Sequence, residues 1–283
     1  MIQPVYFFIL LAILSSTFTK LMHRYVAKDT FPFAYSWLNQ IVATALYLPL
    51  ALSHFSFPTQ PIAWLILIGA CVVWTLVDIS AITSFKNTEV SLKEPIGQTK
   101  LLWALLIGGL ILGENITRQR VIGTLIIFFG VCILLWHPER KFGRLTNRGV
   151  QWTLGTAILI AIVVVLDKVS LNYFNPEMYG FLVYLGPAMI LTCFLPKRIH
   201  QVKHLLKHRR TAAFIAIFLA AATYYFQLKA FSLGEITFVY PILQLGTIFA
   251  VVAGIFFLGE KEHAKQKIFA AAIVVIGAIV IGK

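Results

Sequence analysis

The segment "EVSLKEPIGQTKLLWALLIGGLILGE", residues 89–114, occurs again in altered form as "EITFVYPILQLGTIFAVVAGIFFLGE", residues 235–260. A single offset of 146 aligns all 26 positions, and nine of them are identical. The identities include a proline, a glutamine three residues later and the closing Leu-Gly-Glu. This is more agreement than low-diversity apolar sequence gives by chance, so the chain is predicted to contain an internal duplication.

The duplication extends outward from these two segments. The residues "FTKLMHRY" at 18–25 align with "LDKVSLNY" at 166–173. We therefore predict a first five-helix repeat at residues 1–140 and a second at 148–283, with a basic connecting loop at 141–147. Because five is an odd number, the second repeat would cross a membrane in the opposite direction to the first.

Composition places this duplication in a membrane. Of the 283 residues, 59% are hydrophobic and 12% are charged, whereas an average soluble domain has about 25% charged residues. A transmembrane helix needs about 20 predominantly apolar residues. Ten such runs are present, at 4–22, 33–53, 61–83, 90–112, 120–136, 150–168, 178–196, 211–229, 236–258 and 267–282. The sequence therefore predicts an all-α membrane protein with ten transmembrane helices in two inverted five-helix repeats.

The net charge of +13 predicts how the chain is oriented. Loops that follow odd-numbered spans carry 17 of the 24 Lys and Arg residues, and the other loops and the termini carry five. Cytoplasmic loops of membrane proteins carry an excess of Lys and Arg. We therefore predict a multi-pass protein of the cell (cytoplasmic) membrane with both termini external. Because orientation in the bilayer accounts for the basic loops, no nucleic-acid partner is expected.

Several of these features together carry a family resemblance. They are the ten spans in two halves, a Phe-x-x-x-Glu lead at 85–89 and 231–235, a proline in the fourth and ninth spans, and Leu-Gly-Glu at the ends of those spans. In these features the chain resembles the EamA-like branch of the drug/metabolite transporter superfamily. The resemblance implies a ten-helix, inverted-repeat secondary transporter and leaves the cargo open.

Pro95 and Pro241 occupy matching positions inside two of the apolar runs. A proline lacks the backbone donor of a helix and clashes with the carbonyl four residues back, so both helices are predicted to break. Broken helices at corresponding positions of two repeats indicate the central site of a transporter. We predict the prolines as hinges, and Gln98 and Gln244 as substrate-binding amides. The alternative is that the prolines only bend the helices and the glutamines bond to neighbouring helices.

Two lysines and three aromatic residues complete the predicted substrate site. They are Lys20, Lys168, Trp74, Tyr225 and Tyr240. The two lysines are repeat-related and lie near the ends of their spans, where snorkelling to the membrane surface is the alternative. Aromatic walls with a few polar groups suit an organic solute, although ordinary packing is the alternative for each ring.

Asp78 and Lys100 are predicted to form a charged pair inside the membrane. Each lies about nine or ten residues from the turn between the third and fourth spans, which at 1.5 Å per residue is roughly 14 Å deep. Intramembrane charges are costly and usually face a partner or a water-filled cavity. We predict Asp78 as a proton-coupling carboxylate with Lys100 as its partner, and the alternative is a purely structural ion pair.

His200, His204 and His208 recur every four residues, a spacing that can hold a metal ion. Six Lys and Arg residues accompany them in 197–210 and would repel a cation. A short basic surface helix lying against anionic lipid is therefore preferred. The sequence predicts neither a metal site nor a cofactor.

Glu114 and Glu260 end the fourth and ninth spans in the two copies of Leu-Gly-Glu. Helix N-termini favour negative charge because of the helix dipole. We interpret both glutamates as structural residues, each placed at the start of the next helix.

These features predict a secondary transporter of small organic solutes that works by alternating access, with proton coupling as an option. Lysines at 20, 100, 168 and 229 favour an anionic or zwitterionic cargo, such as an amino acid. The alternatives are an uncoupled facilitator, an exporter of hydrophobic drugs or metabolites, a non-transporting membrane subunit, and a membrane-embedded lipid-processing enzyme.

An enzyme would be expected to carry clustered carboxylates or a His-Glu-x-x-His motif. No such motif occurs, so no catalytic residues are predicted. The expected partners are a small-molecule substrate, the lipid bilayer and protons, with the chain as a monomer or homodimer.

Overall fold

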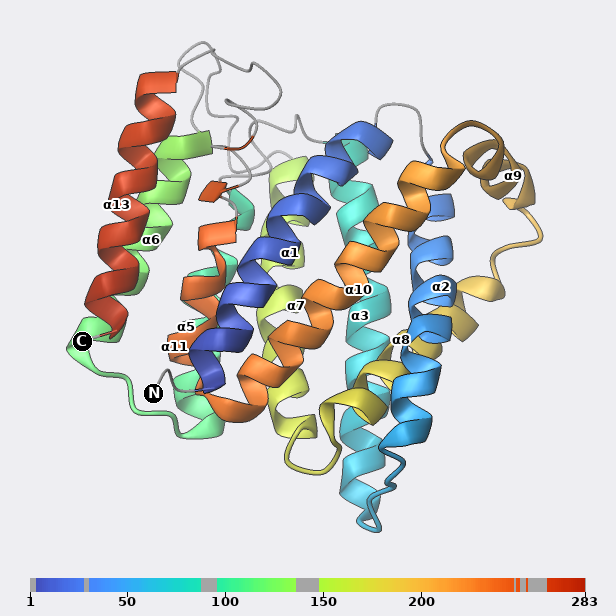
Figure 1. The fold of residues 1–283 in the computed structure, drawn as a ribbon, viewed down its shortest axis with the longest axis horizontal. Coiled ribbons are helices and arrows are strands. Elements are labelled where there is room, and N and C mark those ends of the chain that lie inside the picture. The colour runs from blue at the N-terminus through green and yellow to red at the C-terminus, as the bar shows by residue number, and fades with distance from the viewer. Residues whose placement is uncertain are drawn as a thin grey trace. The chain divides into compact units, whose positions relative to one another are not determined.

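The computed structural model describes residues 4–27, 31–87, 96–135, 148–246, 248–249, 253 and 264–282. Within these ranges every regular element is a helix (Figure 1). The helices are α1 (Pro4–Ala27), α2 (Pro32–Ser53), α3 (Pro61–Asn87), α5 (Lys100–Leu112), α6 (Arg118–Leu135), α7 (Arg148–Ser170), α8 (Pro176–Thr192), α9 (Ile199–His208), α10 (Arg210–Leu233), α11 (Ile236–Leu243) and α13 (Ala264–Gly282).

Each of the ten predicted apolar runs contains helical residues, so the all-α part of the prediction is confirmed. Prolines begin α2, α3 and α8, which suits a position whose missing N–H would have no helical partner. Asn175 caps α8, because its side chain accepts a hydrogen bond from the backbone N–H of Met178 at 2.7 Å. These local features explain where the helices begin.

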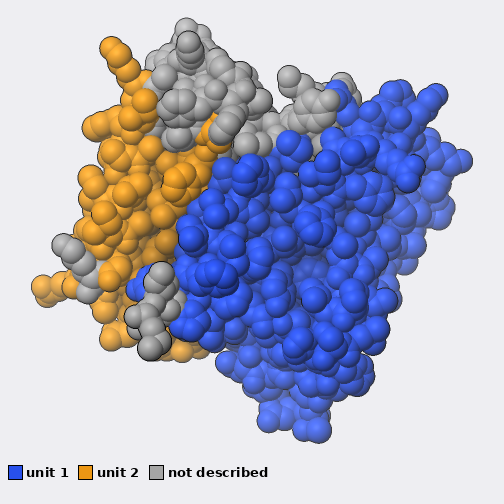
Figure 2. Space-filling view, viewed as in Figure 1, with its two compact units in different colours: residues 1–75, 166–233 blue, residues 76–165, 234–283 orange. Residues whose placement is uncertain are grey.

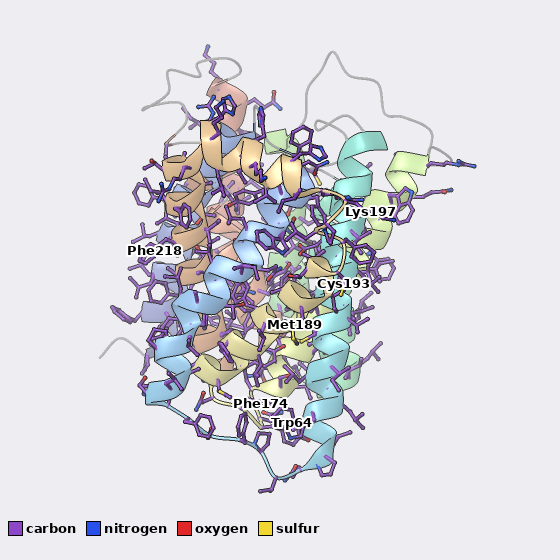
Figure 3. All side chains as sticks on the ribbon, turned by 90° about the vertical axis from the view of Figure 1, so that its right-hand side faces the viewer. Trp64, Phe174, Met189, Cys193, Lys197 and Phe218 are labelled. Carbon is purple, nitrogen blue, oxygen red and sulfur yellow. The ribbon has the colours of Figure 1, made fainter. Side chains whose placement is uncertain are left out.

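Three helical segments are long and apolar enough to cross a membrane. They are Pro61–Ser80 in α3, Arg148–Ser170 (α7) and Arg210–Leu233 (α10). Large apolar side chains also cover the outer surface, as lipid-facing helices require; Met189 is 60% exposed and Phe218 is 59% exposed (Figure 3). The chain is thus built as a helical membrane protein, and the full set of ten spans stays a prediction.

The chain divides into two compact units (Figure 2). The first contains residues 1–75 and 166–233, and the second contains 76–165 and 234–283. Each unit draws on both predicted repeats, because the chain passes from one unit to the other inside α3 and again inside α7. The compact units and the predicted repeats are therefore different divisions of the same chain.

In the first unit, α1 lies along α10, and α2 lies along α8. Its main core contains Tyr47, Tyr179 and Leu228, all almost fully buried. Trp64 and Phe174 pack at right angles beside this core, with ring centroids 5.6 Å apart (Figure 3). The unit therefore has an interior that is rich in aromatic residues.

Helix α9 is the short basic helix expected around the three histidines. It packs against α2 and α10 (Figure 1), and Val202 and Leu205 are buried in that contact. His200, His204 and His208 are exposed on the other side of the helix. The described residues hold no group of three His, Cys, Asp or Glu side chains that could bind a metal ion. The predicted helix is confirmed, and its contact with lipid stays a prediction.

In the second unit, α6 lies along α13 and α5 lies against α11. Glycines allow α6 and α13 to approach closely. A Cβ atom added at Gly123 would lie 2.7 Å from the carbonyl oxygen of Gly277, and one added at Gly277 would lie 2.9 Å from that of Gly123. Small residues that let two backbones meet are typical of helix pairs in membranes. Gly113 ends α5 with a φ of 63°, a left-handed conformation that suits glycine.

Candidate functional site

Helix α11 is interrupted at Gln244, three residues after Pro241. The helix ends at Leu243, and the backbone N–H of Gln244 donates to the carbonyl of Pro241 at 3.1 Å. That bond spans three residues instead of the four of an α-helix, and such tight turns mark a local departure from the helix. The break expected near Pro241 is therefore present.

The repeat-related segment has the same interruption at Gln98. The N–H of Thr99 donates to the carbonyl of Ile96 at 3.1 Å, and the N–H of Leu101 donates to that of Gln98 at 3.0 Å. Regular helix resumes with α5 at Lys100. Pro95, the second predicted hinge, lies outside the described residues. Two segments related by the sequence repeat are thus interrupted at the same glutamine.

Both glutamines are buried. Gln98 is 4% exposed and Gln244 is 7% exposed. Within the described part of the chain, the side-chain oxygen of Gln98 has no hydrogen-bond partner. An unsatisfied buried acceptor costs roughly 1–3 kcal/mol, so this atom is available to a donor. Tyr240, a predicted site residue, is also buried, one turn before Gln244 on α11.

Helices α5 and α11 run antiparallel. A Cβ atom added at Gly108, near the end of α5, would lie 3.4 Å from the side-chain methyl of Thr237, near the start of α11. Gln98 precedes α5 and Gln244 follows α11, so the antiparallel pairing places both amides at the same end of the helix pair. That they line one cavity stays a prediction.

Glu114 holds the other end of this helix pair. Its two carboxylate oxygens accept hydrogen bonds from the backbone N–H groups of Ile236 and Thr237, each at 2.8 Å. Arg120 forms an ion pair with Glu235 and donates to the Thr237 hydroxyl at 2.9 Å. The Glu114 carboxylate thus satisfies two free N–H donors at the start of α11, and Arg120 binds the side chains of the same turn.

The prediction that Glu114 is a structural residue at a helix N-terminus is therefore confirmed. The prediction of which helix it caps was wrong. The carboxylate caps α11, which belongs to the other predicted repeat, instead of the helix that follows Glu114 in the chain. Sequence proximity suggested the next helix, whereas the antiparallel packing of α5 on α11 brings a distant N-terminus closer. Glu260, the repeat-related glutamate, lies outside the described residues.

Asp78 and Lys100, the predicted coupling pair, both lie in the second unit. Asp78 is in α3 and Lys100 is the first residue of α5, and both are half-buried. Both residues take part in polar or electrostatic interactions. Their pairing, and a coupling role for Asp78, stay predictions.

The first unit contains a different buried carboxylate, that of Asp167 in α7. Asp167 is fully buried, and its Oδ1 accepts hydrogen bonds from the Tyr179 hydroxyl at 2.6 Å and from the indole N–H of Trp74 at 3.3 Å. Tyr224 packs edge to face on Trp74, which places its hydroxyl beside the same carboxyl group. Among the described residues, neither Asp167 Oδ2 nor the Tyr224 hydroxyl has a hydrogen-bond partner of normal geometry.

Aromatic rings extend from this carboxylate across the first unit. Trp74 meets Tyr224 edge to face at 5.8 Å between ring centroids. Tyr224 and Tyr184 are 5.4 Å apart, Tyr184 and Tyr47 are 5.3 Å apart, and Tyr47 and Tyr225 are 6.3 Å apart. The structure thus connects two predicted site residues, Trp74 and Tyr225, through one row of aromatic side chains.

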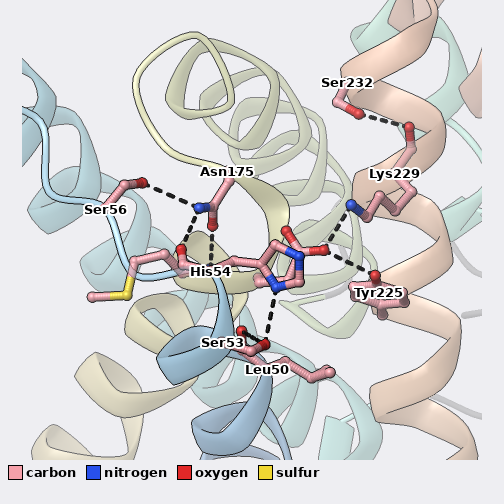
Figure 4. A network of polar contacts seen from close by, with 10 residues as sticks. Leu50, Ser53, His54, Ser56, Asn175, Tyr225, Lys229 and Ser232 are labelled. Carbon is pink, nitrogen blue, oxygen red and sulfur yellow. Dashed lines mark hydrogen bonds and ion pairs between the residues drawn. The ribbon is translucent and has the colours of Figure 1, made fainter.

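Tyr225 ends that row at a second buried carboxylate (Figure 4). Its hydroxyl donates to Glu177 Oε1 at 2.9 Å, and the Lys229 ammonium lies 2.6 Å from the same oxygen. Lys229 also lies 5.6 Å from the ring centroid of Tyr225. Beside this cluster, Asn175 donates to the carbonyl of His54 at 2.6 Å, which ties the start of α8 to the end of α2.

The two predicted site lysines lie on α1 and α7 of the first unit. Lys168 donates to the backbone carbonyl of Phe231, in the last turn of α10. Carbonyls there lack a helical partner, and a cation near a helix C-terminus is favourable. Lys20 is half-buried in α1, which lies along α10. Contact of either lysine with a substrate stays a prediction.

Sequence reasoning gave no role to Asp167 or Glu177. A charged residue inside an apolar span is itself a pointer to function or to a partner, and Asp167 lies within such a span. The adjacent Lys168 made a local partner for Asp167 plausible, although the two side chains bind different groups. The partners of both carboxylates come from other helices, and no sequence spacing relates those helices.

Comparison with known proteins agrees with this architecture. The model of the EamA-like transporter family matches residues 3–136 and 147–283. An uncharacterized transporter from Archaeoglobus fulgidus is 24% identical over 269 residues, which cover 93% of this chain and 92% of that protein. A solved structure described as "Crystal structure of protein" superimposes with a TM-score of 0.80 at 15% identity, covering 98% of this chain and 96% of the other. That likeness extends the shared fold over almost the entire chain.

Proposed function

The chain belongs to the EamA-like transporter family, and from this premise we propose that it is a secondary transporter that moves a small organic metabolite across the cell membrane by alternating access. Membership of the family makes it a membrane transporter. The cargo, the mechanism and the coupling are our proposal. The resemblance seen in the sequence is confirmed by the family match.

One observation carries the proposal: the matched interruption of two repeat-related helices at Gln98 and Gln244. Non-helical backbone inside a membrane protein is tolerated where it is buried in protein or lines a cavity. Transporters use such interruptions, at matching positions of two repeats, to bind cargo near the middle of the membrane. The two buried amides are the groups that we assign to the cargo.

The chemistry of Gln98 favours a cargo that carries a hydrogen-bond donor. Its side-chain oxygen is buried without a partner and can accept from an ammonium or hydroxyl group. This observation favours a zwitterionic metabolite, such as an amino acid, over a purely anionic or purely hydrophobic one. A hydrophobic compound without a hydrogen-bond donor would leave this acceptor unpaired.

The repeat organisation is part of the same proposal. The family model matches the chain twice, over residues 3–136 and 147–283. These matches support two repeats close to the predicted boundaries of 1–140 and 148–283. We propose that the repeats have five spans each and opposite orientations, and that their relative movement exposes the glutamine site to each side in turn.

A cargo screen tests this proposal. The purified full-length protein would be reconstituted in liposomes and assayed for counterflow of radiolabelled amino acids, carboxylates and hydrophobic amines. We expect exchange of at least one zwitterionic compound. Gln98→Ala and Gln244→Ala should each reduce exchange roughly tenfold, the effect of losing about 1.4 kcal/mol of interaction.

Gln227→Ala is the matched control, because Gln227 lies within the continuous helix α10. It should exchange the same compound like the wild type. Normal exchange by both the Gln98 and Gln244 variants would place the cargo site elsewhere. Exchange restricted to hydrophobic amines would support the drug-exporter alternative, and a lack of exchange of every compound would contradict the proposal.

A further inference from the structure

We propose that Asp167 is the carboxyl group that binds and releases the coupling proton of this transporter, and that it holds the proton in the conformation described here. The inference rests on the proposed function and deepens it, because it assigns the coupling step to a residue of the first unit. The step is a reversible protonation, in which a carboxylate oxygen and a proton form one O–H bond.

Burial gives the first part of the argument. Asp167 is fully buried and forms no ion pair with any described residue. A buried charge without a partner is very costly, and such groups take up or lose a proton instead. Two donors reach Oδ1, whereas Oδ2 has none. The neutral acid fits this environment better than the anion does.

The geometry places the proton on Oδ2. The Tyr224 hydroxyl faces the carboxyl group and, like Oδ2, has no hydrogen-bond partner of normal geometry within the described chain. A proton on Oδ2 turns that oxygen into a donor, and the Tyr224 oxygen can accept it. Trp74 and Tyr179 continue to donate to Oδ1. One proton on Oδ2 therefore gives both atoms a partner and removes the buried charge, whereas a Tyr224 hydroxyl donating to Oδ2 would leave that charge in place.

Among the described residues, the titratable groups around Asp167 offer no positive charge to replace the proton. Four titratable side chains interact electrostatically with the carboxyl group. They are Cys71 of α3, Tyr179 of α8, Tyr224 of α10 and Tyr47 of α2. Thiols and phenols are neutral near pH 7 unless they are perturbed towards the anion. These neighbours from four helices therefore leave the proton as the neutralising group.

Two lysines of the first unit have other partners. Lys168, adjacent in the sequence, donates to the carbonyl of Phe231. Lys229 forms its ion pair with Glu177, the second buried carboxylate of this unit. Glu177 therefore remains an ionised member of a salt bridge, and among the described residues of this unit Asp167 is the other buried carboxylate.

Loss of the proton would change the packing of several helices. An anionic Asp167 would demand donors or water at Oδ2, and α3, α8 and α10 supply the side chains that enclose it. Conformations in which these helices admit water would then be favoured over the closed arrangement. A ligand shifts a conformational equilibrium by its difference in affinity for the two states, so proton binding would favour closure around Asp167.

Infrared spectroscopy tests the assignment without a cargo. The full-length protein in lipid nanodiscs would be titrated from about pH 5 to about pH 9, across the range where a carboxyl group that keeps its proton in a buried site can titrate. We expect the C=O stretch of a protonated carboxylic acid to persist at neutral pH and to fade at high pH. Asp167→Asn should abolish this band, whereas Glu177→Gln and Asp78→Asn should retain it.

A second variant keeps the test decisive if Asp167→Asn fails to fold. Tyr179→Phe removes a hydroxyl that donates to Oδ1 and stabilises the anion more than the acid. The midpoint of the carboxyl band should then move up by about one pH unit. An unchanged midpoint, a wild-type protein without the band, or a band that survives in Asp167→Asn would each overturn the assignment.

These outcomes are separable from failure of the proposed function. Counterflow exchange with no titrating Asp167 band would leave the transporter proposal standing and remove the coupling role of Asp167. A titrating Asp167 band in a protein that exchanges no cargo would contradict the proposed function and leave Asp167 as a buried protonation site without a coupling role. Loss of the band in Asp78→Asn instead would return the coupling role to Asp78, as the sequence predicts.

Discussion

At the scale of single residues, the buried carboxylates are the features that sequence reasoning found hardest to place. Asp78 drew attention because its depth could be counted along the chain. Asp167 lies beside a lysine, and adjacency suggested a local partner, whereas its hydrogen bonds come from α3 and α8. Contacts between distant segments decide the protonation and pairing of such groups, and a single sequence does not encode them in any spacing.

Some residue-level predictions could be made because helix geometry alone decides them. Tyr225 and Lys229 are four residues apart and were expected to share a helix face, and the ammonium lies 5.6 Å from the ring centroid. Trp74 and Asp78 have the same spacing, yet the indole N–H of Trp74 donates to Asp167. The spacing of two residues along a helix predicts whether they share a helix face. It does not predict which side chain of another helix each of them contacts.

The Glu177–Lys229 pair allows a direct residue-level prediction. The side chain of Glu177 is 3% exposed and that of Lys229 is 25% exposed. Lys229→Met should lower the free energy of unfolding by about 2–3 kcal/mol, because it leaves a buried carboxylate without its cation while the partial exposure of Lys229 reduces the effect. Thermal unfolding followed by tryptophan fluorescence would measure it.

The double variant Lys229→Met with Glu177→Gln is the control. It removes the uncompensated charge and retains a side chain that Tyr225 can contact, so it should recover most of the lost stability. A double variant as unstable as Lys229→Met alone would show that packing, and not the ion pair, explains the loss.

At the scale of elements, Pro241 predicted an interruption in this span, although its clash is with the carbonyl of Thr237, four residues back. Helix α11 instead continues through Pro241 and ends at Leu243, so the position of the interruption was not predictable from proline chemistry. The interruption at Gln98 lies at the matching position of the first predicted repeat. The basic helix α9 was predictable from its composition. The cap of α11 by Glu114 was not predictable, because it depends on α5 and α11 packing side by side, and Glu114 and Ile236 are 122 residues apart in the chain.

That cap gives an element-level prediction. Glu114→Ala removes both hydrogen bonds to the start of α11 and the negative charge that favours a helix N-terminus. Loss of a capping side chain costs about 0.5–2 kcal/mol, and the charge adds about 0.3–1 kcal/mol. The free energy of unfolding should therefore fall by roughly 1–3 kcal/mol in denaturant titrations.

Glu114→Gln gives an intermediate test of the same contact. Its amide oxygen retains one acceptor for the N–H of Ile236 or Thr237 and loses the charge. Stability between the wild type and Glu114→Ala is expected. Equal stability of all three proteins would mean that the cap contributes nothing measurable to α11.

At the scale of the whole molecule, the class and the helix positions followed from composition and from runs of about 20 apolar residues. The repeat was predicted because two segments of the sequence align without gaps. The division into compact units was not visible, because α3 and α7 each contribute to both units. The direction of the chain in the membrane also remains a prediction from charge.

We predict that loops 137–149 and 197–210 are cytoplasmic and that Lys283 is external. The basis is the positive-inside bias, with 17 Lys and Arg residues in one set of loops and five in the other loops and the termini. Single cysteines would be placed in each loop of a variant without the three native cysteines. Labelling of residues 197–210 by an impermeant reagent in intact cells would reverse the assignment.

The most direct measurement of the central claim, alternating access to the interrupted helices, is the labelling of Thr99→Cys from each side of the membrane. Thr99 is half-buried next to Gln98, at the interruption. Val131→Cys is the control, because Val131 is fully buried in α6. An impermeant thiol reagent should modify Thr99→Cys in both right-side-out and inside-out vesicles and leave Val131→Cys unmodified. Modification of Thr99→Cys from one side only, or from neither side, would contradict the account.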